Sequence, residues 1–192
     1  MTEQVPQNTL DQGNKSEKFS PIARRKSRRY LLQALYQWQI TKTPLEELIP
    51  QFQRDSKYIE ADNRYFLDLL TGIIENHAAL DSAFRQWLDR ETKSLDFIEH
   101  AILWIGAYEL KERLDIPYRV IINESIELAK MFGADQSHKY VNGILDRVAK
   151  LFREIEVDRS RTAHFFKQEP TPQKIVSIEY VKKEKKDSNG IN

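Results

Sequence analysis

Apolar residues recur at three- and four-residue spacings along most of the chain, which is the pattern of amphipathic α-helices. The first predicted helix begins at Ser20 and Pro21, a favourable cap and first-turn pair, and carries the apolar stripe Leu31, Leu35 and Trp38. The helical patterns cover residues 20–40, 43–50, 59–88 (with or without a break near 78), 95–114, 117–132 and 137–155. No two-residue alternation or hairpin turn occurs before residue 156. The sequence therefore predicts an all-α bundle of about six or seven helices.

Individual residues predict where these helices pack and end. The segment 95–114 is apolar nearly all round, so we expect a central helix that is covered on most sides. Pro50 is expected to interrupt the second helix soon after it begins. Gly133 is expected as a left-handed C-terminal cap, and Asp135 or Ser137 as the N-cap of the last helix.

Composition changes at both ends of the chain. Residues 1–19 are polar and aperiodic, which predicts a disordered lead. Residues 158–192 are again polar and contain a lysine-rich run, so we expect a mobile tail in which Lys174–Val181 is compatible with a strand. The helical domain is predicted to span 20–157.

Length and composition exclude several classes of protein. The 192 residues suffice for one domain with a sizeable core. The chain has no Cys, which excludes disulfides, iron–sulfur clusters and a thiol nucleophile. Its longest apolar run, Ala101–Ile105, is too short to span a bilayer, and no signal-peptide pattern occurs near the start. We therefore expect a soluble, cytoplasmic protein that does not bind membranes.

The chain lacks a recognisable catalytic constellation. None of the four His residues follows a Glu by three positions, and the six isolated glycines form no phosphate loop. Glu124 and Glu127 lie on adjacent turns, where one network carboxylate beside one solvated carboxylate is the simpler interpretation. Gly72 and Gly106 fall inside helical patterns, which indicates close approach between helices. The sequence predicts no enzyme, no cofactor and no metal site.

A basic segment opens the first helix. Residues 15–29 contain seven Lys or Arg against one Glu, a net charge of +6. On a helix, Arg25, Arg29, Gln33 and Tyr36 fall within roughly 80° of one another, at 100° per residue. Guanidinium groups bind phosphates, an amide reads base edges and an aromatic ring stacks on bases. Cations are also unfavourable at a helix N-terminus unless an anion binds there, so the stripe predicts contact with a nucleic acid.

The segment Asp135–Tyr140 is a second candidate patch, at the start of the last helix. Ser137, Lys139 and Tyr140 are suited to contact a nucleic acid together with the free N–H groups of the helix end. The alternative is a simple helix cap. A DNA-binding helix-turn-helix is excluded, because the periodicity would bury Lys139 instead of its apolar neighbours.

Three blocks of sequence resemble the NusB family of transcription antitermination factors. The blocks are ARRKSR with QALYQWQ (23–28 and 33–39), IPYRVIINESIELAK (116–130), and FGA with SHKYVNGILD (132–134 and 137–146). They occur in the family's order and spacing, and the resemblance covers about 22–155. It implies an all-helical fold of two packed helical subdomains without enzymatic activity.

The resemblance also implies partners and site residues. Members of the family bind the boxA element of nascent RNA, notably from ribosomal RNA operons, as a heterodimer with the small ribosomal subunit protein NusE. The complex joins other Nus factors on RNA polymerase. The candidate RNA-binding residues, from this resemblance and from the two patches, are Arg24, Arg25, Lys26, Arg28, Arg29, Gln33, Tyr36, Gln136, Ser137, Lys139 and Tyr140. Glu99 is the candidate contact for NusE.

Two departures and two alternatives accompany the resemblance. Gln136 replaces a residue that is often acidic in the family, and Tyr140 replaces a common Phe. One alternative is the RNA-binding module that precedes some ribosomal RNA methyltransferases, although no cofactor-binding α/β domain follows here. The other is a helical protein–protein adaptor with a non-specific basic arm.

Overall fold

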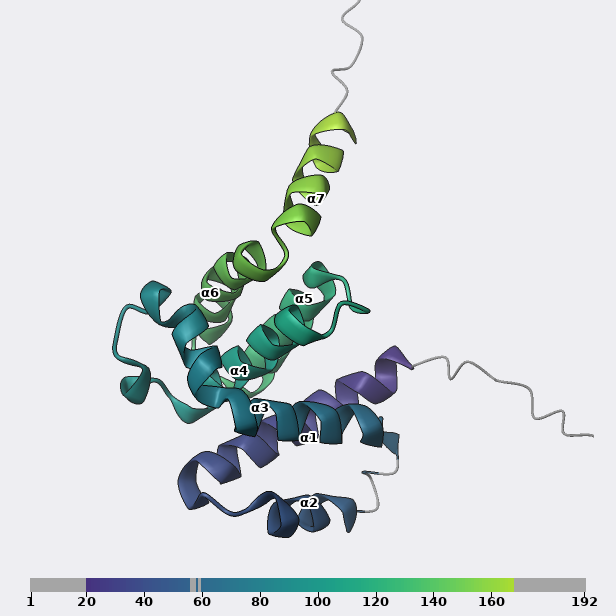
Figure 1. Ribbon diagram of the computed structural model, residues 1–192, viewed down its shortest axis with the longest axis vertical. Coiled ribbons are helices and arrows are strands. Elements are labelled where there is room, and N and C mark those ends of the chain that lie inside the picture. Colours follow the sequence, from purple (N-terminus) through teal and green to yellow (C-terminus); the bar gives the residue numbers. More distant parts are fainter. Residues whose placement is uncertain (1–19, 56–57, 59, 168–192) are drawn as a thin grey trace, which may run out of the picture. The chain divides into compact units, whose positions relative to one another are not determined.

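The computed structural model describes residues 20–55, 58 and 60–167, and these residues form helices and no strands (Figure 1). The helices are α1 (Pro21–Thr41), α2 (Leu45–Gln53), α3 (Asn63–Phe84), α4 (Phe97–Glu112), α5 (Tyr118–Phe132), α6 (Ser137–Phe152) and α7 (Glu154–Lys167), with the short 3-10 helices η2 (Arg85–Trp87) and η3 (Thr92–Ser94) between α3 and α4. The predicted all-α class is thus confirmed. The expected lead at 1–19 and the compatible strand at Lys174–Val181 lie outside the described residues.

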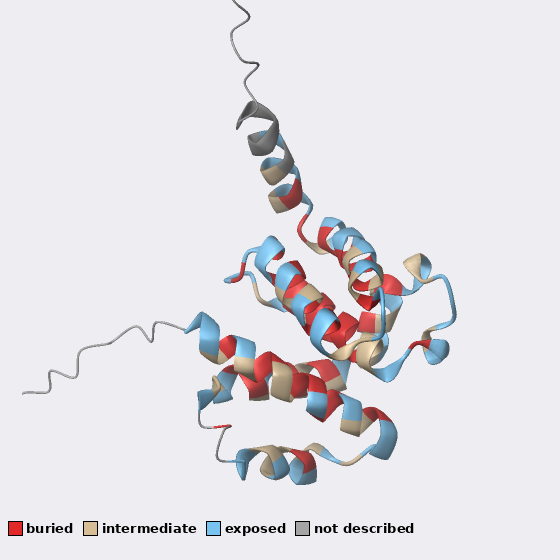
Figure 2. Ribbon diagram, turned by 180° about the vertical axis from the view of Figure 1, so that it is seen from behind, coloured by how far each residue is buried: buried red, intermediate tan, exposed pale blue. Residues whose placement is uncertain are grey.

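Helix α4 lies at the centre of the first compact unit, which ends at Val157. It packs against α1, α3, α5 and α6, and α1 in turn packs against α2 and α3 (Figure 1). Residues 101–107 of α4 are all buried, which confirms the central helix that the apolar pattern predicts. Buried residues, red in Figure 2, occur in each of the helices α1, α3 and α4. The burial of apolar side chains between the helices holds them together.

Side-chain caps set the starts of three helices. The Ser20 hydroxyl accepts a hydrogen bond from the Ala23 N–H, as its position before Pro21 predicts. Asp62 caps α3 and Asp96 caps α4 in the same way. These carboxylates also place negative charge where the helix dipole favours it.

The predicted interruption at Pro50 is wrong. Pro50 lies inside α2, which continues to Gln53. Proline removes only one backbone hydrogen bond from this short helix, and α2 still buries Leu48 completely. Tertiary packing therefore outweighs the local cost of the proline.

The predicted caps between α5 and α6 are confirmed only in part: Gly133 is the C-cap of α5, but it is not left-handed, and neither Asp135 nor Ser137 is the N-cap of α6. Gly133 has φ −82° and ψ 170°, whereas Gln136 has φ 65° and is the N-cap of α6 without a side-chain cap bond. Gly133 is instead needed for space, because a Cβ there would lie 2.8 Å from the Ser137 Cβ and 2.7 Å from the Ala129 carbonyl oxygen. The left-handed residue is thus the exposed Gln136.

The last predicted helix divides at Arg153. Helix α6 ends at Phe152, and α7 extends across the predicted start of the tail to Lys167. The Arg153 side chain donates hydrogen bonds to the carbonyl oxygens of Leu110 (2.5 Å) and Arg113 (2.8 Å). It thereby caps the C-terminal end of α4, which favours a non-helical backbone at Arg153. The part of α7 beyond residue 157 has a mostly polar sequence, so apolar periodicity does not predict it.

The predicted close approach at Gly106 is confirmed, and it leads to a stability test. A Cβ on Gly106 would lie 2.6 Å from the Leu145 Cδ1 and 3.0 Å from the Ser125 Oγ. We expect Gly106→Ala to lower the free energy of unfolding by about 1–3 kcal/mol through overpacking. Gly143→Ala is the matched control, because a Cβ there meets nothing within 4 Å, and it should gain up to about 1 kcal/mol. Urea denaturation checks both, and equal effects would contradict the assignment.

Candidate nucleic-acid interface

Helix α1 divides its basic residues between two faces. Arg24 and Arg28 precede Leu31 and Leu35 on one stripe, at spacings of four, three and four residues, and all four are buried. The predicted stripe of Arg25, Arg29, Gln33 and Tyr36 lies on the other side, and none of its members is buried. The same periodicity that predicts the outer stripe therefore also carries the signal that Arg24 and Arg28 point inward.

Arg28 forms an ion pair in the interior with Glu109 of α4. Its Nε lies 3.0 Å from Oε2, and its Nη2 lies 2.6 Å from Oε1. The Arg28 side chain is 4% exposed and that of Glu109 is 0% exposed. Burial raises the pKa of the Glu109 carboxyl, and the charge and hydrogen bonds of Arg28 oppose that rise. This pair holds α1 against α4.

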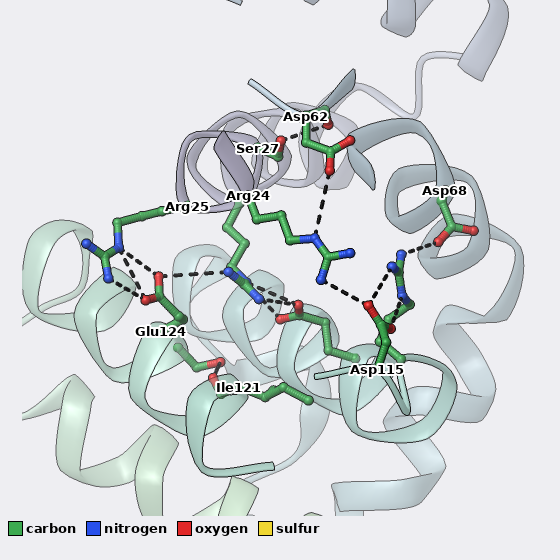
Figure 3. Close-up of polar contacts among 12 residues, drawn as sticks. Arg24, Arg25, Ser27, Asp62, Asp68, Asp115, Ile121 and Glu124 are labelled. Atoms are coloured by element: carbon green, nitrogen blue, oxygen red, sulfur yellow. Dashed lines mark hydrogen bonds and ion pairs between the residues drawn. The ribbon is translucent and has the colours of Figure 1, made fainter. Parts of the chain in front are cut away.

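Arg24 fastens the start of α1 to two other elements (Figure 3). Its Nη1 donates to the Asp115 carboxylate at 3.0 Å, and its Nε lies 3.8 Å from Asp62. Hydrogen bonds from Arg113 and then from Arg24 lower the pKa of Asp115 to about 2. The Arg24 guanidinium also lies 4.9 Å from the centre of the Tyr65 ring. The carboxylates that pair with Arg24 and Arg28 thus belong to the protein itself, and these ion pairs join α1 to the rest of the fold.

Arg25 carries the charge network out to the surface. Its Nε and Nη2 donate to both oxygens of Glu124 in α5, the shortest distance being 2.6 Å (Figure 3). The Arg25 side chain is 53% exposed and that of Glu124 is 14% exposed. The hydrogen bond from Arg25 is the largest of several effects that lower the pKa of Glu124. Glu127 is exposed and pairs with Lys130, so the interpretation of one network carboxylate beside one solvated carboxylate is confirmed.

The rest of the outer stripe lies beside a groove. Lys26 forms an ion pair with Glu60, whereas Arg29 has no hydrogen bond or ion pair within the described ranges. Gln33 and Tyr36 are exposed and border a groove of about 570 Å³. The groove is lined by Leu32, Gln33, Tyr36, Gln37, Ile40, Thr41, Phe52, Ile98 and Phe132. It is mostly apolar and brings α1 and α2 next to the start of α4 and the end of α5.

The second predicted patch lies at the start of α6. Lys139 and Gln136 are exposed, whereas Ser137 is buried and its hydroxyl donates to Glu99 at 2.5 Å. Tyr140 is half-buried, and its hydroxyl donates to Asp89 at 3.0 Å. The candidate partner contact Glu99 and the candidate RNA contact Ser137 are therefore joined by a hydrogen bond.

The two patches meet around the first turn of α4. Ile98 lines the groove beside the outer stripe, and its neighbour Glu99 binds Ser137 at the start of α6. Phe132, the last residue of α5, lines the same groove. Sequence patterns identify Ile98 and Phe132 only as apolar helix positions, because their place in the groove depends on contacts between distant helices.

Arg90 is a further residue that sequence reasoning missed. Its guanidinium lies 5.3 Å from the centre of the Tyr140 ring, and it forms an ion pair with Asp89. It lies between η2 and η3, outside any periodic pattern, so no local signal points to it. It adds a cation beside the aromatic ring of the second patch.

Among the described residues, no group of three or more His, Asp or Glu side chains could hold a metal ion. None of the helices seen there is both long and apolar enough to cross a bilayer.

Comparisons with known proteins agree on one family. The family model for NusB matches residues 25–150. The transcription antitermination protein NusB of Alcanivorax borkumensis is 49% identical over 142 residues, which cover 74% of this chain and 95% of that protein. The NusB of Idiomarina loihiensis is 47% identical, over 70% of this chain and 97% of that protein.

Solved structures give the same fold. T. maritima NusB superposes with a TM-score of 0.61 and 30% identity, covering 70% of this chain and 96% of that chain. A chain from a crystal structure of the antitermination factors NusB and NusE in complex with double-stranded RNA superposes with a TM-score of 0.57. At 19% identity, over 69% of this chain and 100% of that chain, this second match shows the fold alone.

The buried ion pair leads to a second stability test. Arg28→Met leaves the carboxylate of Glu109 buried without its cation, so we expect a loss of about 3–5 kcal/mol in the free energy of unfolding. Arg29→Met removes the same charge from the next position and should change stability by less than about 0.5 kcal/mol. The double variant Arg28→Met with Glu109→Met should regain most of the loss. Denaturant unfolding of the three variants checks this, and equal losses at 28 and 29 would contradict the scaffold role.

Proposed function

The chain belongs to the NusB family of transcription antitermination proteins, and we propose that it binds the boxA element of nascent RNA as a heterodimer with NusE. The complex would join other Nus factors on RNA polymerase in the cytoplasm and support antitermination, notably of ribosomal RNA operons. The observation that carries this proposal is the outer stripe of α1, which meets the start of α6 around the first turn of α4. The family is non-enzymatic, so we propose a scaffolding mechanism without a cofactor.

The proposed RNA surface is narrower than the basic segment. Arg24 and Arg28 are assigned to the scaffold because both residues are buried and their guanidinium groups pair with carboxylates of the protein itself. Ser137 is proposed to act indirectly, through its hydrogen bond to Glu99, because its side chain is buried and its backbone N–H donates to the Ala134 carbonyl oxygen. The remaining contacts are Arg25, Lys26, Arg29, Gln33, Tyr36, Gln136, Lys139 and Tyr140.

The chemistry of these groups suits a short single-stranded RNA. Arg25, Arg29 and Lys139 would hold phosphates, which fixes the position of the strand without reading its sequence. Gln33 would read a base edge, and the exposed ring of Tyr36 would stack on a base. We further propose that residues 20–157 carry this activity, and we assign no role to 1–19 or 158–192.

The apolar groove is the proposed face for NusE. Tyr36 and Ile40, at 42% and 53% exposed, are apolar groups that border it. Glu99 lies next to the groove residue Ile98 and remains the candidate polar contact. In the solved complex named above, NusB, NusE and RNA occur together. We propose that NusE raises the affinity of this surface for RNA, and reciprocal linkage then requires RNA to raise the affinity for NusE by the same factor.

The proposal is tested by RNA binding across a salt series. We expect labelled boxA RNA to bind more tightly than a scrambled RNA of the same length, and NusE to increase that preference. With about three phosphates neutralised, the slope of log K against log salt should be roughly −2. Arg29→Ala and Lys139→Ala should each reduce the slope by about 0.7, whereas Lys150→Ala, about three turns further along α6, should not.

One outcome of this experiment favours the alternative function. Equal and steeply salt-dependent binding to both RNAs, unchanged by NusE, would leave a helical protein–protein adaptor with a non-specific basic arm. Arg25→Ala with Arg29→Ala would then weaken both RNAs equally and leave partner binding intact.

Gln136 offers a test of charge at the second patch. Gln136→Glu places a carboxylate beside the proposed phosphates at the N-terminus of α6, so we expect RNA affinity to fall severalfold. Gln136→Asn is the matched control, because it stays neutral and Asn tolerates the left-handed backbone at this position. Fluorescence anisotropy with boxA RNA checks both variants. Unchanged affinity in Gln136→Glu would remove this position from the RNA surface.

A further inference from the structure

Four charged residues form a chain of alternating sign that runs from the core to the surface. Glu109, Arg28, Glu124 and Arg25 follow one another, each within 4 Å of the next. The exposed fractions of their side chains rise in the same order, from 0% through 4% and 14% to 53%. This series of charged residues therefore reaches solvent at the Arg25–Glu124 ion pair, which joins α1 to α5.

The Arg25–Glu124 pair occupies the part of the guanidinium that a phosphate would use. Nε and Nη2 of Arg25 form one edge, and both donate to the Glu124 carboxylate. That edge binds two oxygens side by side, whether they belong to a carboxylate or to a phosphate. A phosphate bound at Nη1 instead would lie close to the carboxylate and be repelled by it.

Glu124 keeps a cation when Arg25 leaves. The Arg28 Nη1 lies 3.9 Å from its Oε2, on the buried side of the carboxylate. Arg29 also lowers the pKa of Glu124, so its positive charge reaches the same carboxylate. Opening the Arg25–Glu124 ion pair therefore does not leave the Glu124 carboxylate as an isolated charge. This limits the free-energy cost that a phosphate must offset when it replaces Glu124 on Arg25.

We propose that Glu124 is an internal competitor of RNA phosphate for Arg25. The ion pair opens when a phosphate of the RNA takes the Nε–Nη2 edge, and Glu124 then remains paired with Arg28. The competition lowers the affinity of this face for every RNA, because phosphate contacts carry no sequence information. This inference rests on the proposed RNA-binding function. It implies that Arg25 contacts RNA only after its ion pair with Glu124 opens, whereas Arg29 has no ion pair among the described residues to break.

The test compares Glu124→Gln with Glu127→Gln. Both variants remove one negative charge from α5, but Glu127 pairs with the exposed Lys130 and not with Arg25. We expect Glu124→Gln to tighten both boxA and scrambled RNA by about threefold to tenfold and to leave their ratio unchanged. Glu127→Gln should tighten them by less than about twofold through its longer-range charge. With Arg25→Ala in place, the advantage of Glu124→Gln over Glu127→Gln should disappear.

The outcomes separate this inference from the proposed function. Equal effects of Glu124→Gln and Glu127→Gln would overturn the competition, and weaker binding by Glu124→Gln would show that the carboxylate positions Arg25 instead. Failure of the proposed function appears in the wild-type protein alone, as equal binding to boxA and scrambled RNA.

A second measurement uses the wild-type protein, in case Glu124→Gln disturbs the fold. In ¹⁵N NMR spectra, the Arg25 Nε–H resonance, assigned through its absence in Arg25→Lys, should shift as boxA RNA is added. The Arg28 Nε–H resonance should stay in place, because Arg28 keeps Glu109. An Arg25 resonance that does not move at saturating RNA would overturn the proposal.

Discussion

The ion pair between Arg28 and Glu109 is the interaction on which the arrangement of this domain depends. Helix α4 is buried on most sides, yet it carries a carboxylate with no exposure to solvent. A buried carboxylate is tolerated only when a cation and hydrogen bonds compensate for its lost hydration. The guanidinium group of Arg28 supplies both to Glu109. Because Arg28 has to meet Glu109, the rotation of α1 about its own axis is fixed, and with it the direction of every other residue on that helix.

That rotation divides a single arginine-rich segment into two groups with different roles. Residues 24 and 28 point inward to carboxylates of the protein, and residues 25 and 29 point outward from the next stripe. Each buried arginine is neutralised by a partner from a distant part of the chain, so only part of the charge in the segment is available to a ligand. The net positive charge counted over a basic segment of sequence is therefore an upper limit on the charge that its surface offers to a ligand.

The buried network also links the proposed RNA face to the rest of the fold. Glu124 belongs to α5 and accepts from Arg25 of α1, while Glu99 of α4 accepts from Ser137 of α6. Both carboxylates lie where helices that supply proposed RNA contacts meet other helices of the domain. The geometry of the face is thus set by ion pairs and hydrogen bonds between helices as well as by their apolar packing.

The sequence by itself determined the helical class, the start of α1 at Ser20, the central position of α4 and the outer stripe of α1, because each follows from local periodicity or from a cap within one turn. Only the tertiary structure decided the partners of the buried arginines, which lie 81 and 91 residues away along the chain. It also decided the break at Arg153, whose side chain caps α4, and the need for glycine at 133, where a Cβ would clash with Ser137 and with the Ala129 carbonyl oxygen. Periodicity reports which face of a helix is apolar. It carries no information on which distant carboxylate or carbonyl group that face will meet, so those choices become visible only when the helices pack.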